Sequence, residues 1–188
     1  SERQPFPGPG LLVRLVGRFN EDKIRVLKKA TSKVEDELAR FNTQQYFAAI
    51  LDNTTITEGM PERVAKIAAE IRQFFHDTDL EISVRVLKNK STGVKGDVRA
   101  YGHIAAVEVN KKGRVYTPTV RELIKLHVNV VRVAPEFTRI LFSVSNRRSG
   151  DYIIAVRAVT TRDFMTATIA DIDSEVLAKL GAEIMAEN

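Results

Sequence analysis

The order in which helix-period and strand-period stretches follow one another is the feature that most constrains the fold of this chain. Apolar residues recur every three to four positions over 24–41 and again over 64–75, which predicts two amphipathic helices. Stretches such as 80–87 instead alternate apolar and polar side chains, as a strand with one wet face does. Several strands follow one another directly, whereas a doubly wound parallel sheet needs a crossover after each strand. The order therefore predicts an α+β fold, with an antiparallel or mixed sheet and about four helices packed mainly on one face.

The individual elements follow from the same periods and from their capping residues. Helices are expected after the N-cap Asn20, from Pro61, from Thr117, and after Asp173 or Ser174. Residues 128–133 fit both periods, so the pattern leaves open whether they are helix or strand. Strands are expected over 11–19, 46–51, 80–87, 98–109, 139–145, 152–159 and 164–172, with a β-bulge in 98–109 and the last three strands as a meander.

The domain organisation follows from where this series of elements begins. Residues 1–10 contain three prolines and two glycines, which predicts a flexible arm. Residues 11–188 are expected to form a single domain, with a subdivision near 77–79 as the alternative. A chain of this length buries about 70% of its surface on folding and needs no cross-link. The chain has no cysteine, which excludes disulfides, Cys-ligated zinc, iron–sulfur clusters and thiol nucleophiles within it.

Hydropathy and the N-terminal residues bear on the compartment. No stretch approaches the run of about 18 apolar residues that a membrane-spanning helix needs. The first residues also lack the apolar core of a secretory signal. We therefore expect a cytoplasmic setting and no membrane partner.

Positive charge is concentrated in the middle of the chain. The formal net charge is +5, but residues 85–114 alone carry eight Lys or Arg against two carboxylates. Residues 171–188 carry five carboxylates and one lysine. A basic middle and an acidic tail favour phosphate-rich ligands or acidic protein partners.

The preferred hypothesis is a non-enzymatic module that contacts nucleic-acid phosphates through a Lys-rich hairpin and Arg-bearing loops. The hairpin tip 88–97 contains Gly93 and Gly96, whose missing side chains let a phosphate approach the backbone. The candidate nucleic-acid-binding residues are Lys88, Lys90, Lys95, Lys111, Lys112, Arg114, Arg147 and Arg148.

Two alternatives stay open. The first is a protein-interaction or homo-oligomeric assembly module, in which the basic middle meets an acidic surface. The second is an enzyme or small-molecule-binding protein with a pocket between sheet and helices, lined by Tyr101, His103, Arg99 and Arg157. Signatures such as G-x-S-x-G, a Walker loop or G-x-G-x-x-G do not occur, so enzymatic activity is left undecided and no catalytic residue is assigned. No cofactor and no metal are expected.

Overall fold

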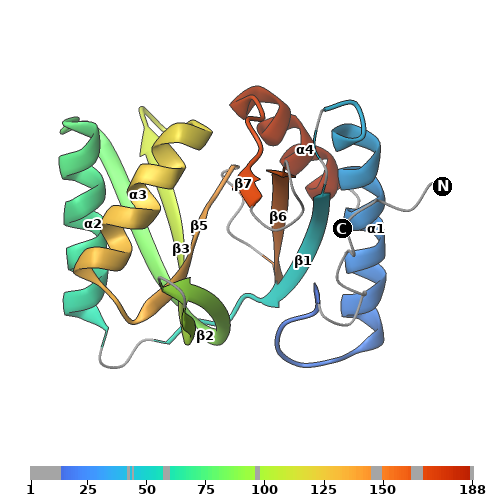
Figure 1. The fold of residues 1–188 in the computed structure, drawn as a ribbon, viewed down its shortest axis with the longest axis horizontal. Coiled ribbons are helices and arrows are strands. Elements are labelled where there is room, and N and C mark those ends of the chain that lie inside the picture. The colour runs from blue at the N-terminus through green and yellow to red at the C-terminus, as the bar shows by residue number, and fades with distance from the viewer. Residues whose placement is uncertain are drawn as a thin grey trace. The chain divides into compact units, whose positions relative to one another are not determined.

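The computed structural model describes residues 14–41, 43, 45–56, 60–95, 98–144, 150–161 and 167–186 (Figure 1). These residues form the α+β fold that the sequence predicts. Their helices are α1 (Glu21–Leu38), α2 (Pro61–Phe75), α3 (Val120–Val133) and α4 (Ser174–Ala186). Their strands are β1 (Gln45–Asp52), β2 (Leu80–Lys95), β3 (Val98–Lys111), β4 (Arg114–Val115), β5 (Phe137–Phe142), β6 (Tyr152–Thr161) and β7 (Ala167–Ile169).

Contacts group the chain into two compact units, and each unit has its own sheet and its own pair of helices. The first unit comprises the residues up to Asp52 and those from Tyr152 onward, and the second comprises Asn53–Asp151. Both boundaries fall at the same end of the β1–β6 pair, where Asp52 is opposite Tyr152. The single domain expected over 11–188 stays a prediction.

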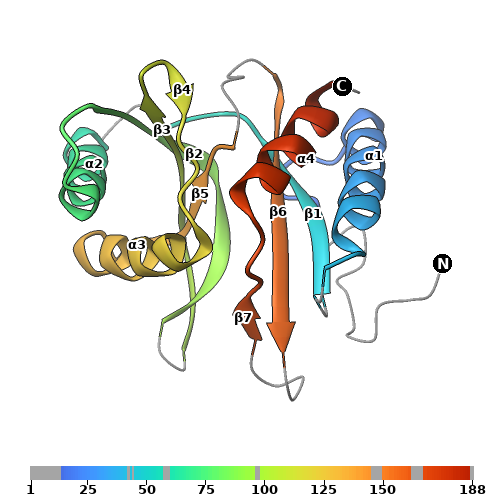
Figure 2. The ribbon, with the colours of Figure 1, turned by 90° about the horizontal axis from the view of Figure 1, so that it is seen from above.

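The first unit is an antiparallel sheet with α1 and α4 on one face (Figure 2). α1 begins where the sequence predicts, because the side-chain oxygen of Asn20 accepts a hydrogen bond from the backbone N–H of Lys23 at 2.7 Å. The sheet order is β1-β6-β7, and every pairing is antiparallel. The core consists of Val26, Leu27, Ala30, Val34, Leu38, Ala48, Ile50, Ala158, Ala170, Ile172, Leu180 and Ile184.

The second unit is a four-stranded sheet in which β3 pairs with each of the other strands. β2 and β4 are antiparallel to β3, whereas β5 is parallel to it. The parallel pairing follows from α3, which carries the chain back along the sheet between β4 and β5. Ile67 and Ile71 of α2 and Leu126 and Val130 of α3 are fully buried in the core of this unit.

Three local predictions are wrong. The described part of 11–19 is not a strand: Leu15 makes an isolated bridge to Ile50, and Gly17 takes a left-handed φ of 94° that breaks an extended run. The last three strands are not a meander, because β5 joins β3 whereas β6 joins β1. The extra residue expected in 98–109 instead lies on the two strands that flank it: the pairing with β2 shifts between Leu87 and Lys90, and β5 has Thr138 between the partners of His103 and Ile104.

The structure also decides the segment that the sequence left open. Residues 128–133 are the last turns of α3, because Val130 continues the buried stripe that Leu126 begins. The hairpin predicted around 88–97 is present, but most of its expected tip is paired strand, since β2 extends to Lys95 and β3 begins at Val98.

Candidate functional site

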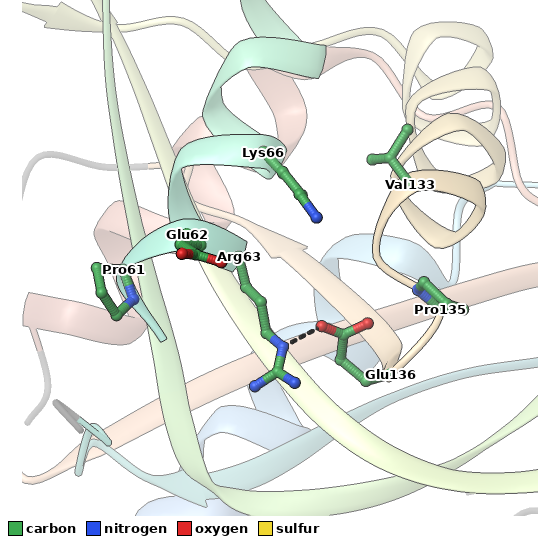
Figure 3. Close-up of a pocket in the computed structure, with 7 residues that line it drawn as sticks. All are labelled: Pro61, Glu62, Arg63, Lys66, Val133, Pro135 and Glu136. Carbon is green, nitrogen blue, oxygen red and sulfur yellow. Dashed lines mark ion pairs between the residues drawn. The ribbon is translucent and has the colours of Figure 1, made fainter. Parts of the chain in front are cut away.

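The candidate site is a pocket of about 570 Å³ in the second unit, where the first turn of α2 faces the turn between α3 and β5 (Figure 3). Its volume is in the range of small-molecule sites, about 300–1,000 Å³. It is lined by Pro61, Glu62, Arg63, Lys66, Val133, Pro135 and Glu136. Four of these seven side chains are ionisable, so the pocket suits a charged ligand better than an apolar one.

Two local features of the backbone place these side chains. Pro61 occupies the first position of α2, where its missing N–H leaves no hydrogen bond unmade. Arg63 and Lys66 follow three residues apart, so both lie on one side of the helix and extend toward the pocket (Figure 3). α3 ends at Val133, and Pro135 cannot continue it, which turns Glu136 toward α2.

Arg63 and Glu136 form an ion pair across the pocket. Arg63 Nε and Glu136 Oε1 are 2.5 Å apart. The two side chains are 46% and 29% exposed, so water screens the pair, and such pairs stabilise a fold by about 0–1 kcal/mol. Lys66 makes no ion pair with any residue in the described ranges. Its ammonium group is therefore available to an anionic ligand.

His103 of β3 adjoins this pocket. Its backbone N–H donates to the carbonyl oxygen of Glu136 at 2.9 Å, and its Nδ1 is buried without a hydrogen-bond partner among the described residues. Burial lowers the pKa of His103, and the positive charges of Lys90 and Arg63 lower it further, against the opposite effect of Glu136. These effects together favour the neutral form of the imidazole over the charged form.

Gly102 allows the turn that carries Glu136 to approach β3. A Cβ atom at this position would lie 2.5 Å from the carbonyl oxygen of Glu136 and 2.8 Å from Cγ2 of Thr138. Both distances are shorter than van der Waals contact. A glycine at this position of β3 is therefore part of what positions the pocket.

The pocket can bind and orient an anionic group. Guanidinium and ammonium groups donate charge-assisted hydrogen bonds to phosphate or carboxylate oxygens. No group of three His, Cys, Asp or Glu side chains that could hold a metal ion occurs in the ranges that the structure describes. The pocket is thus a candidate binding site, and no residue in it is assigned a catalytic step.

The cations predicted from the sequence lie at two separate places on the β2–β3 ribbon. Lys111, Lys112 and Arg114 surround the turn between β3 and β4, beside a second pocket of about 510 Å³. Lys111 Nζ is only 2.6 Å from Asp77 Oδ2, so a carboxylate already neutralises part of this charge.

Lys88 and Lys90 are exposed farther along the ribbon, on β2. Lys90 is in register with His103, whereas Lys111 lies eight residues farther along β3. Eight residues of strand span roughly 27 Å. The described cations therefore do not form one continuous patch. For Lys95 only the backbone is described, at the end of β2, and Arg147 and Arg148 lie outside the described residues.

The polar residues named for a small-molecule pocket belong to two different units. Arg99, Tyr101 and His103 lie on β3 of the second unit, and Tyr101 is 73% exposed. Arg157 belongs to β6 of the first unit. Of the three on β3, His103 is connected to the pocket by the hydrogen bond from its backbone N–H to the carbonyl oxygen of Glu136.

Sequence reasoning missed Lys23, which is fully buried in the first unit. Its Nζ donates to the carbonyl oxygens of Val16 and Arg18 at 2.5 and 3.2 Å and pairs with Asp52 Oδ1 at 2.6 Å. One signal was available, because Lys23 precedes Leu27 by four residues and so lies on the apolar stripe of α1. No comparable signal marks Glu136, which follows a helix and a proline in a turn.

Comparison with known proteins bears directly on function. Residues 139–188 match the family model of the GMP synthase C terminal domain. A subunit of the glutamine-hydrolyzing GMP synthase of Sulfurisphaera tokodaii is 38% identical over 183 residues, which are 97% of this chain and 43% of that protein. The corresponding Saccharolobus solfataricus protein is 38% identical over 188 residues, 98% of this chain and 42% of that protein. The Archaeoglobus fulgidus protein of the same name is 31% identical over 142 residues, 74% of this chain and 35% of that protein.

These similarities correct the preferred hypothesis. The prediction of a non-enzymatic, nucleic-acid-binding module is wrong, since the relatives are subunits of an enzyme, a GMP synthase. The chain spans less than half the length of the first two of these relatives.

Each helix of the described residues is too short or too polar to cross the hydrocarbon layer of a membrane.

Proposed function

We propose that this chain forms part of a glutamine-hydrolysing GMP synthase, as a segment of one of its subunits. The observation that carries the proposal is the 38% identity to two such subunits along 97–98% of this chain. The match to the GMP synthase C terminal domain over residues 139–188 supports the same assignment. Because the chain covers 42–43% of those relatives, the complete reaction belongs to a larger protein.

The contribution of this chain to that synthase is a binding role. GMP is an anion, and a synthase that hydrolyses glutamine must also move nitrogen from that amide to a nucleotide. The chain contains no cysteine, so any thiol nucleophile for amide hydrolysis would be supplied by other residues of the synthase. The pocket with Arg63, Lys66 and Glu136 supplies fixed donors and an acceptor, which suits holding a charged ligand.

We also propose a protein partner, namely another subunit of the synthase, since the relatives are named as one subunit of it. The outer side of α3 supports this proposal. Ile124 and Val128 are 43% and 62% exposed one helical turn apart. Arg121 and Lys125 beside them are exposed and form no ion pair among the described residues. An apolar strip flanked by cations suits a partner with an acidic surface.

A chimaera tests the proposed function. This chain replaces the matching segment of the Saccharolobus solfataricus protein, the remaining synthase subunit is added, and glutamine-dependent GMP formation is measured by chromatography. We expect activity well above that of the same protein with the segment deleted. A parallel assay with ammonia in place of glutamine separates nitrogen transfer between subunits from the formation of GMP itself. A chimaera that folds, as judged by circular dichroism, yet forms no GMP from either nitrogen source would contradict the proposal.

A further inference from the structure

Arg14, Phe47 and Arg157 lie in one row across the sheet of the first unit. Leu15 bridges to Ile50 of β1, and the N–H of Val16 donates to the Ile50 carbonyl at 2.9 Å, so the segment at Arg14 runs along one edge of β1. β6 pairs with the other edge, where Arg157 is directly opposite Phe47. β1 thus lies between the two arginines.

The row is on the sheet face that points away from α1 and α4. Tyr46 packs against the core formed with these helices. Neighbouring residues of a strand point to opposite faces, so Phe47 is on the other one. The Cζ atoms of Arg14 and Arg157 lie 6.0 and 5.9 Å from the centre of the Phe47 ring. The two guanidinium groups are therefore within about 12 Å of each other, beside one ring.

The charge of this pair is not compensated within the described residues. Neither Arg14 nor Arg157 forms an ion pair with any of them. Arg14 Nε is buried without a hydrogen-bond partner in the same ranges, and the Arg157 side chain is exposed. Two like charges repel each other, and a buried N–H without an acceptor is costly. An anion bound at both guanidinium groups would remove both penalties.

We propose that Arg14 and Arg157 bind the phosphate group of a ligand beside Phe47. The planar fork of a guanidinium group matches phosphate in a two-point hydrogen bond. A phosphate monoester carries up to two charges on three terminal oxygens, so it can accept hydrogen bonds from both forks at once. A carboxylate carries one charge on two oxygens and satisfies one fork. The Phe47 ring holds both cations by cation–π attraction in the absence of the ligand.

Calorimetric titration of the whole chain with inorganic phosphate, pyrophosphate and GMP at low ionic strength tests this site. We expect saturable binding of at least one of these probes. Arg157→Gln and Arg14→Gln should each weaken it at least tenfold, whereas Phe47→Leu, which keeps both charges, should weaken it less. The matched control is Arg72→Gln on α2, which removes one exposed cation and should leave the affinity unchanged.

The outcomes are distinct. Tighter binding of GMP than of inorganic phosphate identifies a nucleotide phosphate, and equal affinity identifies the phosphate group alone; both support the site. Equal weakening by Arg157→Gln and Arg72→Gln would show a general charge effect and overturn the proposed site. The absence of saturable binding would overturn it as well. Thermal unfolding without ligand shows whether each variant is folded. If Arg14→Gln is not folded, the affinity of Arg157→Gln alone tests the proposed site. The titration needs no turnover, so its failure is separate from failure of the synthase assay.

Discussion

Replacement of Lys23 by methionine should destabilise the first unit strongly. Lys23 is fully buried, and its Nζ donates to two backbone carbonyls besides pairing with Asp52. Methionine keeps most of the volume of the side chain and removes all three donations. The variant therefore leaves two carbonyl oxygens and one carboxylate without their shared donor.

The expected magnitude follows from how deeply the pair is buried. Removal of one partner from a buried ion pair costs about 3–5 kcal/mol. Asp52 is 19% exposed and also accepts a hydrogen bond from the backbone N–H of Arg18 at 3.1 Å, so water and this donor partly compensate it. We therefore expect the lower end, about 3 kcal/mol. In urea this corresponds to a fall of roughly 1–3 M in the unfolding midpoint.

Urea unfolding followed by circular dichroism measures this loss. Lys28→Met is the matched control, because Lys28 is exposed on the same helix, and its effect should stay within about 0.5 kcal/mol. The double variant Lys23→Met/Asp52→Leu should recover part of the loss, since it leaves no carboxylate without its partner. A loss below about 1 kcal/mol for Lys23→Met, or one equal to that of Lys28→Met, would refute the reasoning.

Four further predictions concern the second unit. Gly102→Ala should lower the free energy of unfolding, measured in urea, by about 1–3 kcal/mol, because the added Cβ would lie 2.5 Å from the carbonyl oxygen of Glu136. An unchanged free energy of unfolding would show that the turn that carries Glu136 moves freely. Arg63→Gln should raise the pKa of His103 in an NMR titration, since the charge of Arg63 lowers it, and an unchanged pKa would contradict this electrostatic account. Because folding lowers the pKa of His103, the free energy of unfolding should decrease as the pH falls below the pKa of this histidine in the unfolded chain, about 6.5. Thr119→Ala should cost about 1 kcal/mol, because Thr119 caps α3 reciprocally with the third helical residue, and retention of full thermal stability would count against that role.

Local patterns in the sequence located the helices well. Asn20 caps α1, Pro61 begins α2, and Asp173 accepts the N–H of Glu175 where α4 begins. These signals act over three or four residues, so a linear pattern contains them in full. Strand partners were harder to predict, because the pairing of β1 with β6 joins residues about 100 positions apart.

The candidate site could not be predicted in the same way. Arg63 and Glu136 are 73 positions apart, and nothing in their local patterns relates them. The charge count did identify a basic segment at 85–114, but a count along the chain does not say that Lys90 and Lys111 lie far apart on one ribbon. The position of each lysine along the ribbon depends on the register in which β2 pairs with β3. A count of charges does not contain that register.

The sequence by itself determined the α+β class, the helix starts and the basic middle of the chain, because period, capping and charge are local properties. Only the tertiary structure decided that β5 and β6 belong to different sheets, that Lys23 is buried against Asp52, and that Arg14 and Arg157 meet at Phe47. The physical reason is that each of these features depends on contacts between segments far apart in the chain, and such contacts are selected by packing and pairing of the whole fold.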